Sequence, residues 1–315
     1  MSVLMFCLGG LGDLLVAAPS MALLRRTLVG QRRALLCRGE YGGLFLDSGI
    51  ADEVIPLEGR GASFLFGGAG VPPQVRTGDC SLAIGWTQAP PRSGIEASLR
   101  GLGIPTVFIS AAGPQLRSPL SRSFFADTLA AFPGPGGAPP DFDECSRIHS
   151  EKGGMAAARA RLGNVISGDR GLAVIHPGSG GAAKVWPFER FLEIARRLRR
   201  AGVPGVFMTG EAEEGVAVSG RLEQEALPPG WTWVRRPPIL AVAGLLAEAS
   251  LYIGNDSGIT HLAAACGASV TALFLEKNLP AWEPYGRSVV LAAEALSDLE
   301  TEAVWAALLK NMRTK

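Results

Sequence analysis

Short apolar runs alternate with helix-like patterns along the whole chain. In the first half, the apolar runs predict strands near 3–8, 34–37, 53–57, 82–86 and 106–109. In the second half, they predict strands near 171–176, 206–209, 251–254 and 270–274. Continuous apolar strands separated by helices are typical of parallel sheets, because parallel strands are buried on both faces and joined by helical crossovers. The pattern therefore predicts an α/β fold.

The helix-like segments differ in how clearly they are marked. Residues 187–200 are amphipathic, with Phe188, Phe191 and Leu198 on one stripe and the charged residues elsewhere. Further helices are predicted after the first glycine-rich turn, as far as about Leu28, and over 151–162. Residues 59–70 are glycine-rich and aperiodic, so we expect a mobile loop there and no packed element.

Proline and glycine are most concentrated between Phe132 and Phe142. This composition resists both helix and sheet, so it predicts a linker that ends an N-terminal domain of residues 1–142 and precedes a C-terminal domain of residues 143–315. Two such domains are expected to leave a central cleft, with ligands at the carboxyl ends of the strands.

The charge of the chain is balanced, with 30 Lys and Arg, 29 Asp and Glu, and a net charge of +1. A general nucleic-acid binder has an obvious basic footprint, so we expect no nucleic-acid partner. The arginines Arg25, Arg26, Arg32, Arg33 and Arg38 nevertheless lie close together near the first predicted helix. They form either a solvated surface or a patch for anionic lipid headgroups or sugar phosphates.

The cysteines are scattered, without a Cys-x-x-Cys pair, at positions Cys7, Cys37, Cys80, Cys145 and Cys266. This pattern predicts free thiols in a reducing compartment and no metal site. The apolar start lacks basic residues and an A-x-A pattern, so we expect no signal peptide, and no apolar run is long enough to span a bilayer. We therefore expect a cytoplasmic protein, at most peripheral on the inner face of the inner membrane.

The first stretch that carries chemistry, Leu8-Gly-Gly-Leu-Gly-Asp13, joins the first predicted strand to the first predicted helix. Glycine-rich turns at this place usually hold a nucleotide phosphate at a helix N-terminus. A carboxylate repels phosphate, so Asp13 argues against that use. The alternative role for Asp13 is ordinary helix capping.

Residues 176–187 form a second such stretch, His176-Pro-Gly-Ser-Gly-Gly-Ala-Ala-Lys-Val-Trp-Pro, between a strand and the amphipathic helix. Its glycines, including Gly180, allow backbone N–H groups to approach an anion closely. Ser179 adds a hydroxyl donor and Lys184 adds a positive charge. We predict a phosphate cradle; the alternative is an ordinary loop with a surface lysine.

The third stretch, Gly254-Asn-Asp-Ser-Gly-Ile-Thr-His, also follows an apolar strand and opens a helix. Asp256 or Ser257 is expected to cap that helix, and the N–H groups of Ser257 and Gly258 are suited to a diphosphate. His261 lies about one turn after Ser257, where it is either structural or part of the site. Glu214 follows another strand, so its carboxylate either binds ribose hydroxyls or simply favours a helix N-terminus.

These pieces, in this order, resemble the ADP-heptose:lipopolysaccharide heptosyltransferases, glycosyltransferase family 9. The matching segments are Leu8-Gly-Gly-Leu-Gly-Asp-Leu-Leu, His176-Pro-Gly-Ser with Lys184-x-Trp-Pro, Gly210 with Glu214, Ile253-Gly-Asn-Asp-Ser-Gly-x-x-His-Leu-Ala-Ala, and Trp282-x-Pro-Tyr-Gly. The resemblance covers nearly the whole chain. It implies a GT-B fold, in which two Rossmann-like parallel-sheet domains face a central cleft.

The resemblance also implies an inverting, metal-independent transfer of a heptose or similar sugar. The donor would be an ADP-sugar, with no further cofactor, and the acceptor a lipopolysaccharide core or related glycan. Carried onto this sequence, Asp13 is the general base and Lys184 the catalytic cation. The donor-binding residues are Ser179, Gly180, Glu214, Asp256, Ser257, Gly258 and His261. Apart from this carry-over, the candidate acceptor residues are Gly10 and Gly12 of the first turn, and Arg60, Arg117 and Arg122, which either hold acceptor phosphates or carboxylates or are solvated loop residues.

The sequence departs from the family at Phe274-Leu-Glu-Lys-Asn-Leu-Pro280, where relatives commonly carry a Phe-Gly-x-Thr run. Two other functions remain open: a GT-B sugar-nucleotide epimerase or hydrolase, and a sugar-nucleotide-binding protein without transferase activity. A dinucleotide dehydrogenase is disfavoured, because neither glycine loop reads G-x-G-x-x-G.

Overall fold

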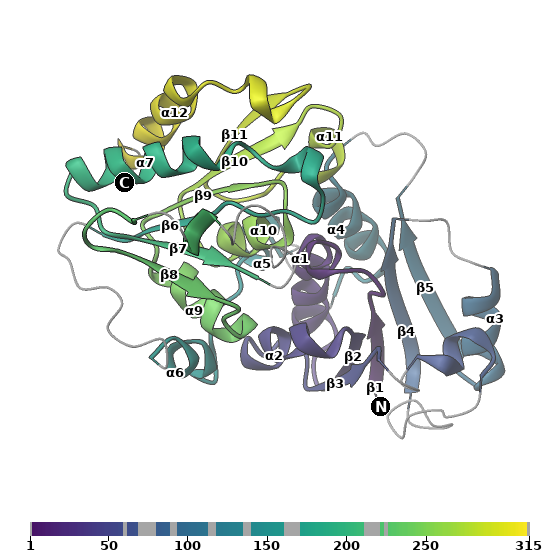
Figure 1. Ribbon diagram of the computed structural model, residues 1–315. Coiled ribbons are helices and arrows are strands. Elements are labelled where there is room, and N and C mark those ends of the chain that lie inside the picture. Colours follow the sequence, from purple (N-terminus) through teal and green to yellow (C-terminus); the bar gives the residue numbers. More distant parts are fainter. Residues whose placement is uncertain are drawn as a thin grey trace. The chain divides into compact units, whose positions relative to one another are not determined.

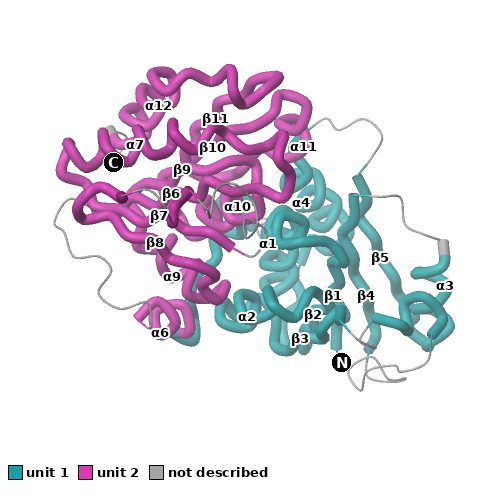
Figure 2. The backbone as a smooth tube through the Cα atoms, in the orientation of Figure 1, with its two compact units in different colours: residues 1–153 teal, residues 154–315 magenta. Residues whose placement is uncertain are grey.

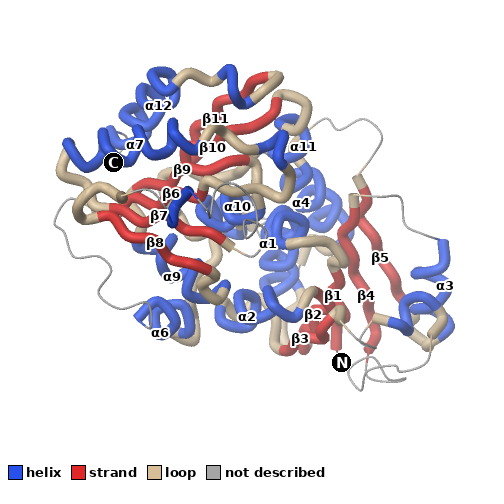
Figure 3. The backbone as a smooth tube through the Cα atoms, viewed as in Figure 1, coloured by secondary structure: helices blue, strands red, loops and turns tan. Residues whose placement is uncertain are grey.

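The structure, a computed structural model, describes residues 2–58, 62–68, 80–88, 93–112, 118–134, 140–160, 171–210, 221–223 and 226–313. The chain divides into two compact units, Met1–Gly153 and Gly154–Lys315 (Figure 2). Each unit contains a parallel sheet with helices on its faces (Figures 1 and 3). Two Rossmann-like parallel-sheet domains are thus confirmed.

The first unit is built on five strands in the order β3-β2-β1-β4-β5, and every pair is parallel. The strands are β1 (Ser2–Phe6), β2 (Arg32–Cys37), β3 (Glu53–Pro56), β4 (Cys80–Thr87) and β5 (Thr106–Ala111). Its helices are α1 (Leu11–Thr27), α2 (Gly39–Asp47), α3 (Ser93–Gly101), α4 (Leu120–Ala131) and α5 (Phe142–Cys145). All strands of this sheet lie where the apolar runs predicted them.

The second unit has six strands in the order β11-β10-β9-β6-β7-β8, again all parallel. The strands are β6 (Ala173–His176), β7 (Gly205–Thr209), β8 (Trp231–Arg235), β9 (Leu251–Asn255), β10 (Val270–Leu275) and β11 (Ser288–Ala293). The helices are α6 (Gly154–Ala160), α7 (Phe188–Arg200), α9 (Ile239–Glu248), α10 (Gly258–Ala265), α11 (Leu279–Trp282) and α12 (Thr301–Arg313). The strands predicted from the sequence did not include β8 or β11, which form the two edges of this sheet.

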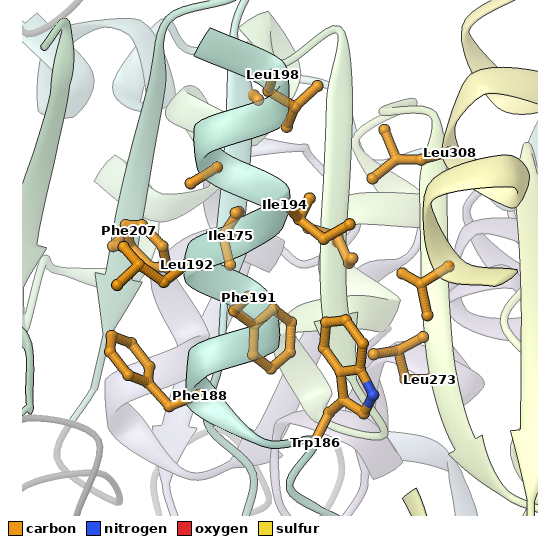
Figure 4. Close-up of a cluster of buried hydrophobic side chains, with 14 of the residues drawn as sticks. Ile175, Trp186, Phe188, Phe191, Leu192, Ile194, Leu198, Phe207, Leu273 and Leu308 are labelled. Carbon is orange, nitrogen blue, oxygen red and sulfur yellow. The ribbon is translucent and has the colours of Figure 1, made fainter. Parts of the chain in front are cut away.

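The core of the second unit lies between its sheet and the helices α7 and α12 (Figure 4). The apolar stripe predicted on 187–200 forms this contact: Phe191 is fully buried against the edge of the Trp186 ring, with ring centroids 4.9 Å apart. Phe188 packs against Phe207 of β7. Complete burial of one such side chain contributes about 1.5–3 kcal/mol. The helices α9 and α10 lie on the other side of the sheet (Figures 1 and 3).

One prediction is wrong within residues 59–70. Residues 62–68 contain a short 3₁₀ helix, η1 (Ser63–Phe66), whose Phe64 and Leu65 are buried in the core of the first unit. The apolar pair Phe64-Leu65 therefore outweighs the surrounding glycines, because it fills a space beside α3 and the sheet. The other residues of this segment, 59–61 and 69–70, lie outside the described residues.

Residues beyond the predicted linker also belong to the first unit. Arg25 and Arg26 of α1 form ion pairs with Glu151 and Glu144, respectively. The compact-unit boundary at Gly153 therefore follows the Pro- and Gly-rich segment that was expected to separate the domains.

Four of the five clustered arginines have carboxylate partners. Besides the pairs of Arg25 and Arg26, Arg32 pairs with Glu53 at 2.8 Å and Arg33 with Asp52 at 3.0 Å. Burial raises the pKa of Asp52, but its hydrogen bonds with Arg33 outweigh that effect and lower the pKa overall. Paired charges leave a weaker field than free ones, so this arrangement favours a salt-bridged surface over a lipid-binding patch.

Candidate active site

The sequence motifs lie at the topological switch point of each sheet. Counted within the second unit, the strand order from β8 to β11 is 3-2-1-4-5-6, so the switch point lies between β6 and β9. In the first unit it lies between β1 and β4. Ligands of open α/β sheets bind outside the carboxyl ends of the strands at such points. Asp13 follows β1, the loop with Ser179 and Lys184 follows β6, and Asp256 follows β9.

Asp13 lies in the first turn of α1, where its carboxylate accepts hydrogen bonds at both oxygens. The backbone N–H of Gly10 donates to Oδ2 at 2.9 Å, and the side-chain amide of Gln88 donates to Oδ1. Asp13 thus provides part of the helix cap that was considered as its alternative role. The side chain is nevertheless only half-buried, so part of it is exposed to solvent.

Gly9 makes room for this carboxylate. A Cβ atom added at Gly9 would lie 2.2 Å from Cγ of Asp13, far below the van der Waals limit. A Cβ at Gly10 would come no closer than 3.9 Å to Oδ2 of Asp13. Gly9 therefore leaves space for the Asp13 carboxylate itself, a role that the sequence analysis did not assign to it.

Cys7 is buried beneath the same turn and does not supply a nucleophile. Burial, with a smaller contribution from the Asp13 charge, raises the pKa of its thiol to about 12. The thiol is therefore protonated at neutral pH, and the thiolate is the reactive form of cysteine.

In the second unit, Asp256 and Lys184 form an ion pair with an N–O distance of 2.8 Å. The Asp256 side chain is 6% exposed, whereas the Lys184 side chain is 37% exposed, so the ammonium can still reach a ligand. Asn278 donates its side-chain amide to the same carboxylate oxygen at 2.7 Å. Asn278 follows β10, within the segment that departs from the family pattern, and sequence reasoning missed it.

The loop after β6 is fastened to the end of β9. The hydroxyl of Ser179 donates to the main-chain oxygen of Asp256 at 2.7 Å. Asn255 donates its amide to the carbonyl of Pro177 at 2.8 Å and accepts from the backbone N–H of Trp186 at 3.1 Å. Asn255 is fully buried, so these bonds replace those it would make in water. The two predicted anion-binding stretches are therefore joined to each other by direct hydrogen bonds.

Ser257 caps α10, as one of the two predicted alternatives. Its side-chain oxygen accepts from the backbone N–H of Thr260 at 3.4 Å and lies 3.5 Å from Nδ1 of His176. Gly258 is the first residue of the helix, where backbone N–H groups have no partner within the helix. This helix start supplies N–H donors and a positive dipole end, which suit a phosphate.

His261 is buried beside two aromatic rings. Its ring centroid lies 6.5 Å from that of Phe274 and 5.9 Å from that of Trp282. This packing gives the ring a structural role in holding α10 against β10 and α11. A role for His261 in donor binding remains a prediction.

Of the remaining candidate residues, the structure describes only Arg122 and Gly12. Arg122, near the start of α4, lies over the Phe142 ring with its guanidinium carbon 4.5 Å from the ring centroid. Gly12 lies in the first turn of α1. Glu214, Arg60 and Arg117 lie outside the described residues.

Over the described ranges, no group of three or more His, Cys, Asp or Glu side chains is arranged to hold a metal ion, and no helix is long and apolar enough to cross a membrane.

Two parallel Rossmann-like sheets, each with polar residues at its switch point, define an α/β protein of the GT-B class. The sequence model of glycosyltransferase family 9 (heptosyltransferase) matches residues 119–303. The chain belongs to this family.

Individual relatives are more distant. Lipopolysaccharide heptosyltransferase 3 of Escherichia coli is 25% identical over 126 residues, which are 37% of this chain and 35% of that protein. The match thus spans about a third of the length of that curated relative.

Two solved structures show the same fold over nearly the whole chain. A family 9 glycosyltransferase from Veillonella parvula has a TM-score of 0.80 at 17% identity, and the match covers 100% of this chain and 98% of the Veillonella chain. The E. coli ADP-heptose lps heptosyltransferase II has a TM-score of 0.74 at 16% identity, with coverages of 100% and 99%. At these identities the likeness concerns the fold alone.

Proposed function

We propose that this protein is an inverting, metal-independent glycosyltransferase that moves a heptose or similar sugar from an ADP-sugar to a lipopolysaccharide core or related glycan. The observation that carries the proposal is the division of chemistry between the two switch points. One presents an accessible carboxylate, Asp13, and the other presents a cation and helix N–H donors. Family membership supports this division, as does the name of the ADP-heptose transferase with the same fold.

The second unit is suited to the donor. A diphosphate at the start of α10 would receive hydrogen bonds from the N–H groups of Ser257 and Gly258 and charge stabilisation from Lys184. Lys184 has three ammonium hydrogens, so its contact with Asp256 leaves donors for a phosphate. Gly180 carries no side chain, and a Cβ there would meet no atom within 4 Å, so a phosphate can approach the loop closely. In this proposal Glu214 binds the ribose.

The first unit is suited to the acceptor. Asp13 takes the proton from an acceptor hydroxyl while the hydroxyl oxygen attacks the anomeric carbon. The bond from that carbon to the phosphate oxygen breaks, through an oxocarbenium-like state, and the new glycosidic bond forms on the opposite face. The nucleoside diphosphate leaves with the bonding electron pair, and Lys184 and the helix N–H groups stabilise its charge without a metal ion.

Product analysis tests this proposal. We expect the purified protein, with ADP-heptose and a heptose-free lipopolysaccharide core, to add one sugar to the acceptor, as read by mass spectrometry. ADP should appear at an appreciable rate only when the acceptor is present. Fast nucleotide release from donor alone would instead support the epimerase or hydrolase, and donor binding without any product would support the non-catalytic binder.

A thermal-shift panel of ADP-, UDP-, GDP- and CDP-sugars tests the choice of nucleotide. A ligand that binds only the folded state raises the apparent melting temperature. We expect the largest increase with ADP-sugars. Strong stabilisation by a UDP-sugar, with none by ADP or ADP-heptose, would overturn the ADP assignment.

We also propose that the protein works in the cytoplasm, with at most peripheral contact with the inner membrane.

A further inference from the structure

We propose that Gln88 is a positioning residue for Asp13: its side-chain amide holds the carboxylate in the orientation that proton removal needs. The inference rests on the proposed function, in which Asp13 is the general base. The two residues are 75 positions apart in the sequence, and the Gln88 amide donates to Oδ1 of Asp13. The sequence carries no motif that marks Gln88.

The topology of the first sheet brings Gln88 to this place. The neighbouring strands β1 and β4 run parallel, and Phe6 at the end of β1 pairs with Gly85 of β4. Three positions beyond these partners stand Gly9 and Gln88. Because parallel neighbours leave a sheet at the same edge, Gln88 comes to the level of Gly9, against which the Asp13 carboxylate packs.

Gln88 and Gly10 hold the carboxylate from two separate elements. The main chain at the start of α1 binds Oδ2 through the N–H of Gly10, and the end of β4 binds Oδ1 through Gln88. Rotation of the carboxylate would break at least one of these bonds. Each carboxylate oxygen has about two acceptor positions, so each keeps one for a substrate hydroxyl. Such double anchoring matters because a general base must come within about 2.6–3.2 Å of the proton donor.

The neutral amide suits this task better than a cation. A lysine or arginine at this position would pair with the carboxylate and favour its charged form, which weakens a base. The glutamine amide donates a hydrogen bond without adding charge. Gln88 thus orients Asp13 and leaves its negative charge available to receive the acceptor proton.

Gln88 is exposed, so its substitution separates this role from folding. We expect Gln88→Ala to lower kcat by between about 10- and 100-fold, because a displacement of about 1 Å costs roughly 100-fold in rate. The KM values for donor and acceptor should stay within about twofold, since the side chain acts through Asp13. Gln88→Glu keeps the shape but repels Asp13 when ionised, and it should lose at least as much activity as Gln88→Ala.

The assay is acceptor-dependent release of ADP from ADP-heptose, with melting temperatures measured in parallel. Glu96→Gln is the matched control, because Glu96 is an exposed residue of α3 that forms a surface pair with Arg100. Wild-type kcat in both Gln88 variants would overturn the inference. So would an increase in acceptor KM with unchanged kcat, which would mean that Gln88 binds substrate directly. Failure of the proposed function is a separate result: the wild type would not transfer sugar at all.

Discussion

Replacement of Gly9 by alanine is expected to displace the Asp13 carboxylate together with the first turn of α1 that carries it. The new Cβ would lie 2.2 Å from Cγ, 2.3 Å from Oδ2 and 2.5 Å from Cβ of Asp13, whereas ordinary contacts begin at 3.4 Å. Gly9 is not among the glycines with positive φ, so its backbone conformation accepts alanine. The carboxylate must therefore move by about 1.2 Å, the difference between 3.4 and 2.2 Å, and the first turn of α1 must shift with it because the Asp13 Cβ is fixed to the main chain.

This displacement sets the size of the expected effect. A shift of about 1 Å in a catalytic group costs roughly 100-fold in rate. We therefore expect Gly9→Ala to lower kcat about 100-fold, which corresponds to about 2.7 kcal/mol of activation free energy. The affinity for ADP should be unchanged, because the proposed diphosphate site belongs to the other unit.

The assay measures kcat from acceptor-dependent ADP release and the Kd for ADP by calorimetry. The adjacent Gly10→Ala is the matched comparison: its Cβ stays 3.9 Å from Asp13, so we expect a loss below about 10-fold. Gly94→Ala serves as a neutral control, because no atom lies within 4 Å of its added Cβ. Wild-type kcat in Gly9→Ala, or equal losses in Gly9→Ala and Gly10→Ala, would refute the reasoning.

Three further predictions concern the donor site, the core and pH. Lys184→Ala should weaken ADP binding by roughly 10- to 100-fold in calorimetry, because a hydrogen bond to a charged group contributes about 1.5–3 kcal/mol; unchanged affinity would contradict the role of Lys184. Trp186→Phe should lower the free energy of urea-induced unfolding by about 2–4 kcal/mol, since it loses the indole hydrogen bond to the Leu299 carbonyl and leaves a cavity, whereas a change below about 0.5 kcal/mol would contradict this packing. Burial raises the pKa of Cys7 from 9.0 to about 12, so its contribution to stability is full below about pH 9 and is lost as the pH rises towards 12. Cys7→Ala should therefore reduce the fall in unfolding free energy between pH 8 and pH 10 by about 1.4 kcal/mol, and an unchanged fall would contradict the shift.

The central strands were predictable because each is a continuous apolar run buried on both faces. The two missed strands, β8 and β11, are edge strands whose residues are largely half-exposed. The sequence of β8, Trp-Thr-Trp-Val-Arg, interrupts the apolar pattern with Thr232 and Arg235. The sequence of β11, Ser-Val-Val-Leu-Ala-Ala, is an apolar run that was not recognised as a strand. Phe64 was missed because its burial depends on the core of a whole unit, which local glycine content does not reveal.

In the candidate site too, some residues could be predicted from the sequence and others could not. Motif residues such as Asp13, Lys184 and Asp256 could be found because they lie in recognisable strand-to-helix turns. Gln88 and Asn278 could not, because each follows a strand whose neighbour in the sheet is known only once the strand order is known. A polar residue directly after a strand is the available signal, and topology decides which of these residues matter.

The most direct test of Asp13 as the general base compares sugar transfer by Asp13→Ala and by the wild type. The substrates are ADP-heptose and a heptose-free lipopolysaccharide core. Mass spectrometry of the acceptor gives the turnover, and calorimetry gives the ADP affinity of each protein. We predict that Asp13→Ala loses most transfer, because it lacks the general base, and binds ADP with nearly wild-type affinity. Wild-type turnover in Asp13→Ala would contradict this prediction.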